Sequence, residues 1–136
     1  MAEDGVALIH TIGRSGPPGY SNPWIHKYIF PGGSTPAQSE IGASIEKSGL
    51  ITTDLEVLRL HYAKTLRHWY ERFQKNRGSI AQLTDEQFCR MWEFYLCICE
   101  VAFEYSNLVV YQMQLTKTHG VVPITRDYLY QSSSTS

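Results

Sequence analysis

No glycine-x-glycine turn occurs anywhere in the 136 residues of this chain. Doubly wound folds hold nucleoside-containing cofactors with such a turn between a strand and a helix, together with an acidic residue on the following strand. The sequence therefore predicts that this chain alone does not bind a cofactor of that kind tightly.

Charge, cysteine and long apolar runs are also scarce. The net charge of -1 gives no general attraction to nucleic acid. Three cysteines, at 89, 97 and 99, indicate neither a disulfide framework nor a zinc site, because no second Cys or His cluster has ligand spacing. No run approaches the ~20 apolar residues of a membrane span, and the N-terminus lacks the basic and apolar regions of a signal peptide. We therefore expect a soluble, cytoplasmic protein.

Apolar residues make up 43% of the chain, which is enough for a packed core and argues against disorder. The length fits one domain. We expect that domain to span residues 1–130, and the serine-rich residues 131–136 to be disordered.

The first half of the chain indicates two strands around one helix. Residues 5–11 form an apolar run typical of a strand buried on both faces. Residues 24–30 end at Pro31-Gly-Gly33 and indicate a loop or short turn. Thr35 can cap a helix that starts with Pro36 and ends at Gly49. Residues 50–60 predict the second strand.

The second half indicates two long helices and a third strand. Residues 61–83 carry a helical apolar stripe, although Gly78 is a possible break. Thr84 begins a capping box for the second helix. The stripe predicted on this second helix consists of Phe88, Met91, Tyr95, Cys99 and Ala102, with Trp92 and Phe103 beside it. Residues 107–116 alternate as a strand. The order strand, helix, strand, two helices, strand indicates α/β architecture.

Several side chains have both a structural and a functional interpretation. His10 lies at the predicted end of the first strand, where ligands gather in open α/β sheets, but a histidine there is more often satisfied by backbone partners. Tyr62 and Cys99 lie on apolar stripes and fit a plain core role. The basic residues of the first long helix and the acidic ones of the second indicate solvated or mutually paired surfaces more than steering toward anionic phospholipid.

Three stretches carry a family resemblance: residues 8–13 (LIHTIG), 24–33 (WIHKYIFPGG) and 61–73 (HYAKTLRHWYERF). They resemble the C-terminal part of cyclopropane-fatty-acyl-phospholipid and mycolic acid cyclopropane synthases, which are S-adenosylmethionine-dependent methyltransferases. The resemblance runs from about residue 5 to residue 130. It implies the C-terminal half of a Rossmann-like class I methyltransferase fold, with three strands and a two-helix insertion. The last strand would lie antiparallel between the other two.

The same resemblance implies the roles of six residues. His10, the carbonyl of Ile12 and the hydroxyl of Tyr62 match groups that hold bicarbonate, which acts as the general base in the complete enzyme. A base is required because methyl transfer to an alkene leaves a carbocation, and ring closure then releases a proton. Tyr28, Phe30 and Cys99 match positions near the lipid-facing pocket. The other bicarbonate ligands of the family, a cysteine and a glutamate, lie outside this chain.

The implied partners are unsaturated phospholipid acyl chains, reached peripherally at a membrane surface, with no nucleic acid. The apolar first strand lacks lysine or proline to protect its edge, so we also expect a homo-oligomer. Two alternatives stay open: a non-catalytic module that self-associates or binds a partner, and part of a related lipid or amine methyltransferase.

Overall fold

A computed structural model describes residues 1–130. Its elements are β1 (Val6–Arg14), α1 (Pro23–Tyr28), α2 (Gln38–Ser48), β2 (Ile51–Leu58), α3 (His61–Leu83), α4 (Glu86–Tyr105), β3 (Leu108–Thr116) and a 3-10 helix, η1 (Arg126–Leu129). This order confirms the α/β architecture and every long element predicted from the sequence. The serine-rich tail lies outside the described residues.

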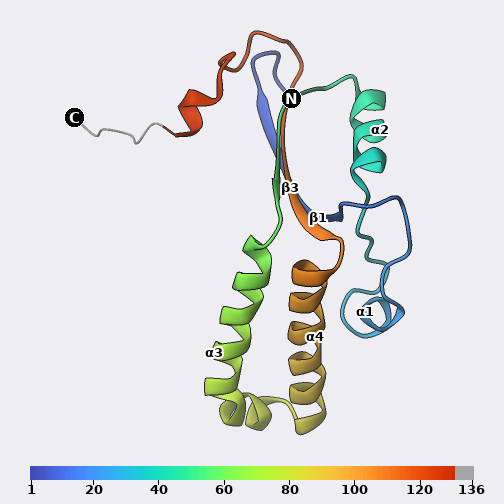
Figure 1. The fold of residues 1–136 in the computed structure, drawn as a ribbon, viewed down its shortest axis with the longest axis vertical. Helices are drawn as coiled ribbons and strands as arrows, with labels where there is room; N and C mark the ends of the chain where they lie inside the picture. The colour runs from blue at the N-terminus through green and yellow to red at the C-terminus, as the bar shows by residue number, and fades with distance from the viewer. Residues whose placement is uncertain (131–136) are drawn as a thin grey trace, which may run out of the picture.

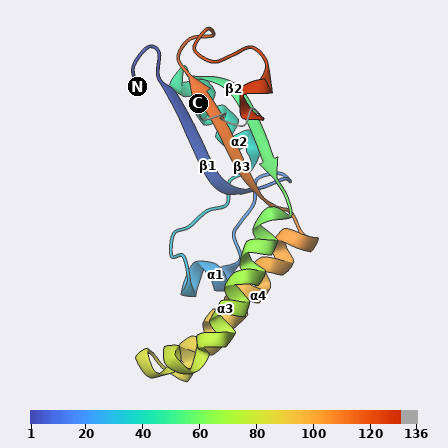
Figure 2. The same cartoon turned by 90° about the vertical axis from the view of Figure 1, so that its left-hand side faces the viewer.

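The three strands form one sheet in the order β1-β3-β2, and β3 pairs antiparallel with both neighbours. The last strand of the chain is therefore the central one, as the family resemblance implied; Figure 1 shows the whole chain, and Figure 2 shows β3 between β1 and β2. His10 and Glu56 both pair with Gln112, and Ile12 and Leu58 both pair with Val110. Side chains two residues apart on a strand share a face, so this register defines the two faces of the sheet.

One face of the sheet packs against α2, which Figure 2 shows lying against the strands. Its core consists of Ile45 of α2 with Val109, Tyr111, Met113 and Leu115 of β3. On the opposite face Ile12, Val110 and Leu58 pack into the core of the hairpin, while Leu8 is exposed farther along β1. The alternation predicted for residues 107–116 is confirmed.

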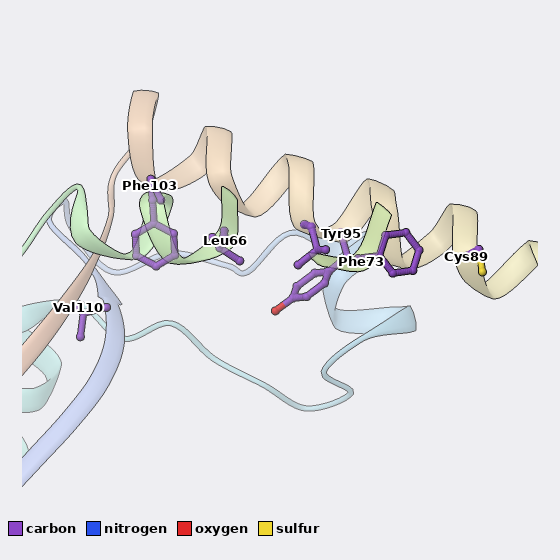
Figure 3. Close-up of a cluster of buried hydrophobic side chains, with 8 residues drawn as sticks. Leu66, Phe73, Cys89, Tyr95, Phe103 and Val110 are labelled. Carbon is purple, nitrogen blue, oxygen red and sulfur yellow. The ribbon is translucent and has the colours of Figure 1, made fainter. Parts of the chain in front are cut away.

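The helices α3 and α4 form a long antiparallel hairpin that extends from one end of the sheet (Figures 1 and 2). Figure 3 shows the cluster along its seam, and the labelled residues are Leu66, Phe73, Cys89, Tyr95, Phe103 and Val110. On α4 the predicted Tyr95 and Phe103 are buried in this cluster, and Cys89 and Leu96, which the predicted stripe omitted, are buried there as well. Gly78 does not interrupt α3.

Polar pairs connect the two helices beside this seam. Arg67 Nε donates to Glu100 Oε1 at 2.8 Å, and Arg77 binds Glu86 through both of its terminal nitrogens. Tyr70 and Gln74 donate to the same oxygen of Glu93. The prediction of mutual pairing is therefore confirmed for Arg67 with Glu100 and for Glu86 with Arg77, whereas Glu93 is bound by neutral side chains.

Several local predictions are wrong. Strand β1 extends to Arg14, so His10 lies in its middle, and the strand is not covered on both faces: Leu8 is 64% exposed. Residues 23–28 form a helix rather than a loop, because the Asn22 side chain accepts from the N–H groups of Trp24 and Ile25.

Both predicted helix caps are displaced. Helix α2 begins at Gln38, where Glu40 accepts from the N–H of Ala37. The predicted cap, Thr35, binds a side chain of β1 instead. Helix α4 is capped by Asp85, which accepts from the N–H of Phe88 at 2.6 Å, and not by Thr84. Among residues 1–130, no helix combines the length and the apolar character that a bilayer crossing demands.

Candidate functional site

A cavity of about 330 Å³ lies where the hairpin meets the sheet. Its walls come from the end of β1, the first turn of α3, the last turns of α4 and the loop of residues 20–35 that carries α1. The lining is largely apolar and includes Ile12, Ile25, Phe30, Tyr62, Ile98, Cys99, Ala102, Phe103 and Leu108. Such a space suits a flexible hydrocarbon chain better than a polar ligand.

Tyr62 supplies a polar group to this apolar space. Its ring packs 4.9 Å from the ring of Phe103 and 5.9 Å from that of Trp69. Burial raises the pKa of Tyr62, and the neighbouring Cys99 thiol raises it further. The phenol is therefore protonated at neutral pH and can donate its O–H to an anion. Within residues 1–130, no protein hydrogen bond is among the causes of this shift.

Cys99 lies on the face of α4 that lines the cavity, beside Ala102. Burial raises the pKa of the Cys99 thiol to about 11. A thiol of this kind is neutral at physiological pH and behaves as a small apolar group. Its position fits a packing contact with a ligand and not a nucleophile.

Ile12 enters the cavity from the end of β1, and Phe30 enters it from the loop that follows α1. The carbonyl oxygen of Ile12 accepts a hydrogen bond from the hydroxyl of its neighbour Thr11 at 3.0 Å. Phe30 packs edge-on against the buried ring of Tyr95, at 6.1 Å. The structure thus brings together four of the six predicted site residues: Ile12, Phe30, Tyr62 and Cys99.

His10 and Tyr28 lie outside this cavity. His10 is exposed on the same face of the sheet as Ile12, one strand repeat farther from the hairpin, and its Nδ1 lies 3.0 Å from Gln112 Nε2. Tyr28 packs against Trp24 at 5.4 Å and lines a more open depression with Phe88 and Met91. His10 therefore lies on the exposed part of the sheet and Tyr28 on the outer surface of α1, and neither lines the cavity.

Arg14 is a site residue that the sequence interpretation missed. Its guanidinium donates to the carbonyl and hydroxyl oxygens of Thr35, at 3.0 and 2.9 Å, and to the carbonyl of Tyr20 at 3.1 Å. The backbone N–H of Arg14 also donates to the carbonyl of Pro36. These bonds fasten both ends of the loop that covers the cavity. In the sequence, the one feature that could have identified Arg14 was a single charged residue at the end of an apolar strand.

The residues present fit part of an anion site. Tyr62 and Ile12 line the same cavity, and a tyrosine hydroxyl can donate to an anion while a backbone carbonyl can accept from a protonated bicarbonate oxygen. A glycine-x-glycine turn that would hold S-adenosylmethionine does not occur in the sequence. We therefore assign no step of cofactor binding to this chain.

Comparison with known proteins gives the family directly. The family model described as mycolic acid cyclopropane synthetase matches residues 1–113. This chain belongs to that family. A probable fatty acid methyltransferase of Pseudomonas putida is 38% identical over 131 residues, which are 93% of this chain and 33% of that protein. A tuberculostearic acid methyltransferase of Mycobacterium tuberculosis is 46% identical over 72% of this chain and 23% of its own.

Cyclopropane-fatty-acyl-phospholipid synthase of Escherichia coli is 35% identical over 86% of this chain and 30% of its own length. Among solved structures, a cyclopropane synthase of Mycobacterium tuberculosis matches with a TM-score of 0.77 and 27% identity, over 85% of this chain and 45% of that one. A mycolic acid cyclopropane synthase complexed with SAH and CTAB matches with a TM-score of 0.74 and 29% identity, over 82% and 44% of the two chains.

These matches confirm that the fold is part of a class I methyltransferase fold with a two-helix insertion. The chain spans about a third or less of the length of these curated relatives, and less than half of these solved structures. The family is one of S-adenosylmethionine-dependent lipid methyltransferases.

Proposed function

We propose that this chain forms the acyl-chain side of an active site that adds a methylene from S-adenosylmethionine across the double bond of an unsaturated phospholipid. The observation that carries the proposal is the cavity itself. It places Tyr62 beside the apolar side chains of Ile12, Phe30 and Cys99, while polar residues such as Arg14, Asn22 and Thr35 line the side formed by the loop of residues 20–35. An acyl chain needs such an apolar lining along its length, and the reaction needs a polar group only at the double bond.

The Tyr62 donor has a specific use in this chemistry. Methyl transfer to the alkene gives a carbocation, and the cyclopropane forms when a proton leaves the transferred methyl group. Bicarbonate supplies the base when it is bound. The protonated phenol of Tyr62 would donate to that anion, and the carbonyl of Ile12 would accept from its hydroxyl. An acyl chain packed against the apolar side chains beside Tyr62 would limit the access of water, which would otherwise capture the carbocation.

His10 is proposed as a further anion ligand, supported by its place on the same face of β1 as Ile12. It shares a face of the sheet with Ile12, and in this structure its ring nitrogen contacts Gln112. Release of that contact would allow the imidazole to turn toward the hairpin. Tyr28 is proposed as a contact for the lipid outside the cavity, on the exposed side of α1.

The test uses the protein that contains this chain together with its cofactor-binding region. Transfer of label from S-adenosylmethionine to vesicles of cis-unsaturated phospholipid is measured for Tyr62→Phe and His10→Ala. Each variant should lower turnover by roughly ten- to a thousandfold, as expected when a group that positions a general base is removed.

The matched control is Tyr105→Phe, which removes a phenol that is 78% exposed on α4 and outside the cavity. It should leave turnover unchanged. Wild-type rates in both Tyr62→Phe and His10→Ala would contradict the proposed roles of these residues. Absence of label in the lipid would contradict the proposed reaction.

A second candidate is methylation of an acyl chain without ring closure. It is favoured by the 46% identity to the tuberculostearic acid methyltransferase, which is higher than the 35% to the E. coli synthase. Proton NMR of the extracted lipid separates the two, because a cyclopropane methylene and a branched methyl group have different shifts. We expect the cyclopropane.

A further inference from the structure

The outer face of α3 carries a line of basic residues that the cavity does not use. Lys64, His68, Arg72 and Lys75 follow one another at spacings of four, four and three residues, and all four are exposed. Such spacings place side chains on one face of a helix. We call this set the basic stripe. Since a helix rises ~1.5 Å per residue, it is about 16 Å long.

Pairing with α4 does not neutralise the stripe. The arginines of α3 that turn toward α4 are Arg67, bound to Glu100, and Arg77, bound to Glu86. Among residues 1–130, Lys64, Arg72 and Lys75 take part in no salt bridge. The acids beside the stripe are Glu71 of α3, at 3.7 Å from His68, and two residues of α4, Glu104 and the Arg67-bound Glu100, which line a hollow together with Lys64 and His68. The stripe therefore presents a net positive charge to its surroundings.

The position of the stripe leaves it open to a flat partner. Figure 1 shows α1 on the far side of α4 from α3, so neither α1 nor α2 covers the outer face of α3. Trp69 lies three residues before Arg72 and is 37% exposed, with its other edge packed on Tyr62. A half-exposed indole beside basic side chains is typical of a protein surface that meets the interfacial region of a bilayer.

We propose that the basic stripe docks the hairpin on an anionic phospholipid bilayer. The proposal rests on the proposed function, because a lipid substrate brings the protein to such a surface. A bilayer is favoured over nucleic acid because the positive charge is confined to one helix face. On α4, Glu104 is exposed and would repel a polyanion that wraps around the hairpin, whereas Glu86 and Glu100 are already paired with Arg77 and Arg67.

Sedimentation of the chain with vesicles tests this proposal without any need for catalysis. The vesicles contain saturated phosphatidylglycerol and phosphatidylcholine in equal parts, or phosphatidylcholine alone, so neither offers a double bond. Each Lys or Arg near an anionic membrane contributes about fivefold to partitioning. The variant Lys64→Gln/Arg72→Gln/Lys75→Gln should therefore bind the anionic vesicles about a hundredfold more weakly. Near 1 M salt, where screening extends only ~3 Å, the wild-type chain should lose its binding as well.

The matched control, Lys27→Gln/Lys47→Gln/Lys117→Gln, removes the same charge from α1, α2 and the segment after β3. It should keep most of the affinity, and circular dichroism checks that both variants fold. Equal loss in the two variants, or equal binding of the wild type to both vesicles, would overturn the proposal. Tighter, stripe-dependent binding to duplex DNA than to vesicles would also overturn it. Activity on lipid in neutral detergent micelles reports separately on the proposed function, because it does not require the stripe.

Discussion

Replacement of Leu66 by alanine tests the hairpin that holds Tyr62 and Cys99 in place. Leu66 is fully buried, one turn after Tyr62, in the cluster that joins α3 to α4 (Figure 3). A Leu→Ala change at a buried site costs 2–5 kcal/mol, and the larger losses occur where the surroundings cannot collapse. Because α3 is packed against a helix on one side only, the neighbours of Leu66 can move partly into the space that the substitution leaves. We therefore expect the free energy of unfolding to fall by about 3 kcal/mol.

Urea unfolding followed by circular dichroism measures this loss, and the melting temperature should fall by about 10 °C. The control is Leu83→Ala, the same substitution at the end of the same helix, where the side chain is 85% exposed. It should change the free energy of unfolding by less than about 0.5 kcal/mol. A loss of stability below about 1 kcal/mol for Leu66→Ala, or a loss no larger than that of Leu83→Ala, would refute the packing described for the hairpin.

The remaining predictions concern a thiol, an ion pair and a sheet edge. Burial raises the pKa of Cys99 to about 11, so the thiol ionises at lower pH in the unfolded chain than in the folded one, and stability should fall as pH rises through about 9 to 11. The drop in the urea midpoint between about pH 8 and about pH 10.5 should be smaller in Cys99→Ala than in the wild type, and an equal drop would contradict the assignment. Arg67→Met leaves the buried Glu100 without its ion pair and should lower the free energy of unfolding by about 2 kcal/mol, and Arg67→Met/Glu100→Leu should restore most of that stability. A double mutant no more stable than the single mutant would contradict this prediction. Finally, the exposed β1 should associate with a second copy at high micromolar concentration, and light scattering should show Leu8→Lys as a monomer; a monomeric wild type would refute the edge argument.

The sequence was sufficient for the long elements because their signals are local. Helix α2 ends at Gly49, whose φ of 72° belongs to the left-handed region that glycine adopts readily. The alternation of residues 108–116 placed Val109 and Met113 on the covered face of the sheet. The antiparallel central position of β3 came only from the family resemblance, since no local pattern specifies strand order.

The wrong predictions concern contacts between distant residues. Thr35 has the chemistry of a helix cap, but Arg14, 21 residues away, binds its hydroxyl and carbonyl oxygens. His10 was expected at the end of a strand, but pairing continues to Arg14 and Leu108. A short helix at residues 23–28 had a readable signal in the Asn22-Pro23 pair, a cap followed by proline at the first position.

The site could be predicted only in part, because it too depends on contacts between residues that are far apart in the sequence. Tyr62 and Cys99 lie on helical stripes, but which face of each helix turns toward the sheet depends on how the hairpin packs. The cavity joins them to Ile12 and Phe30, which are separated from them by 32 to 87 residues of chain. No sequence period relates these four positions.

The most direct test of the account is where an acyl chain binds. A phospholipid with a photoreactive diazirine beside the cis double bond is bound to the protein that contains this chain, irradiated and mapped by mass spectrometry of the peptides. We predict adducts on the cavity lining, at Tyr62, Ile98 or Cys99, and competition by unlabelled cis-unsaturated lipid. Adducts confined to the open depression at Phe88 and Met91, or labelling that unsaturated lipid does not displace, would contradict the assignment of this cavity to the acyl chain.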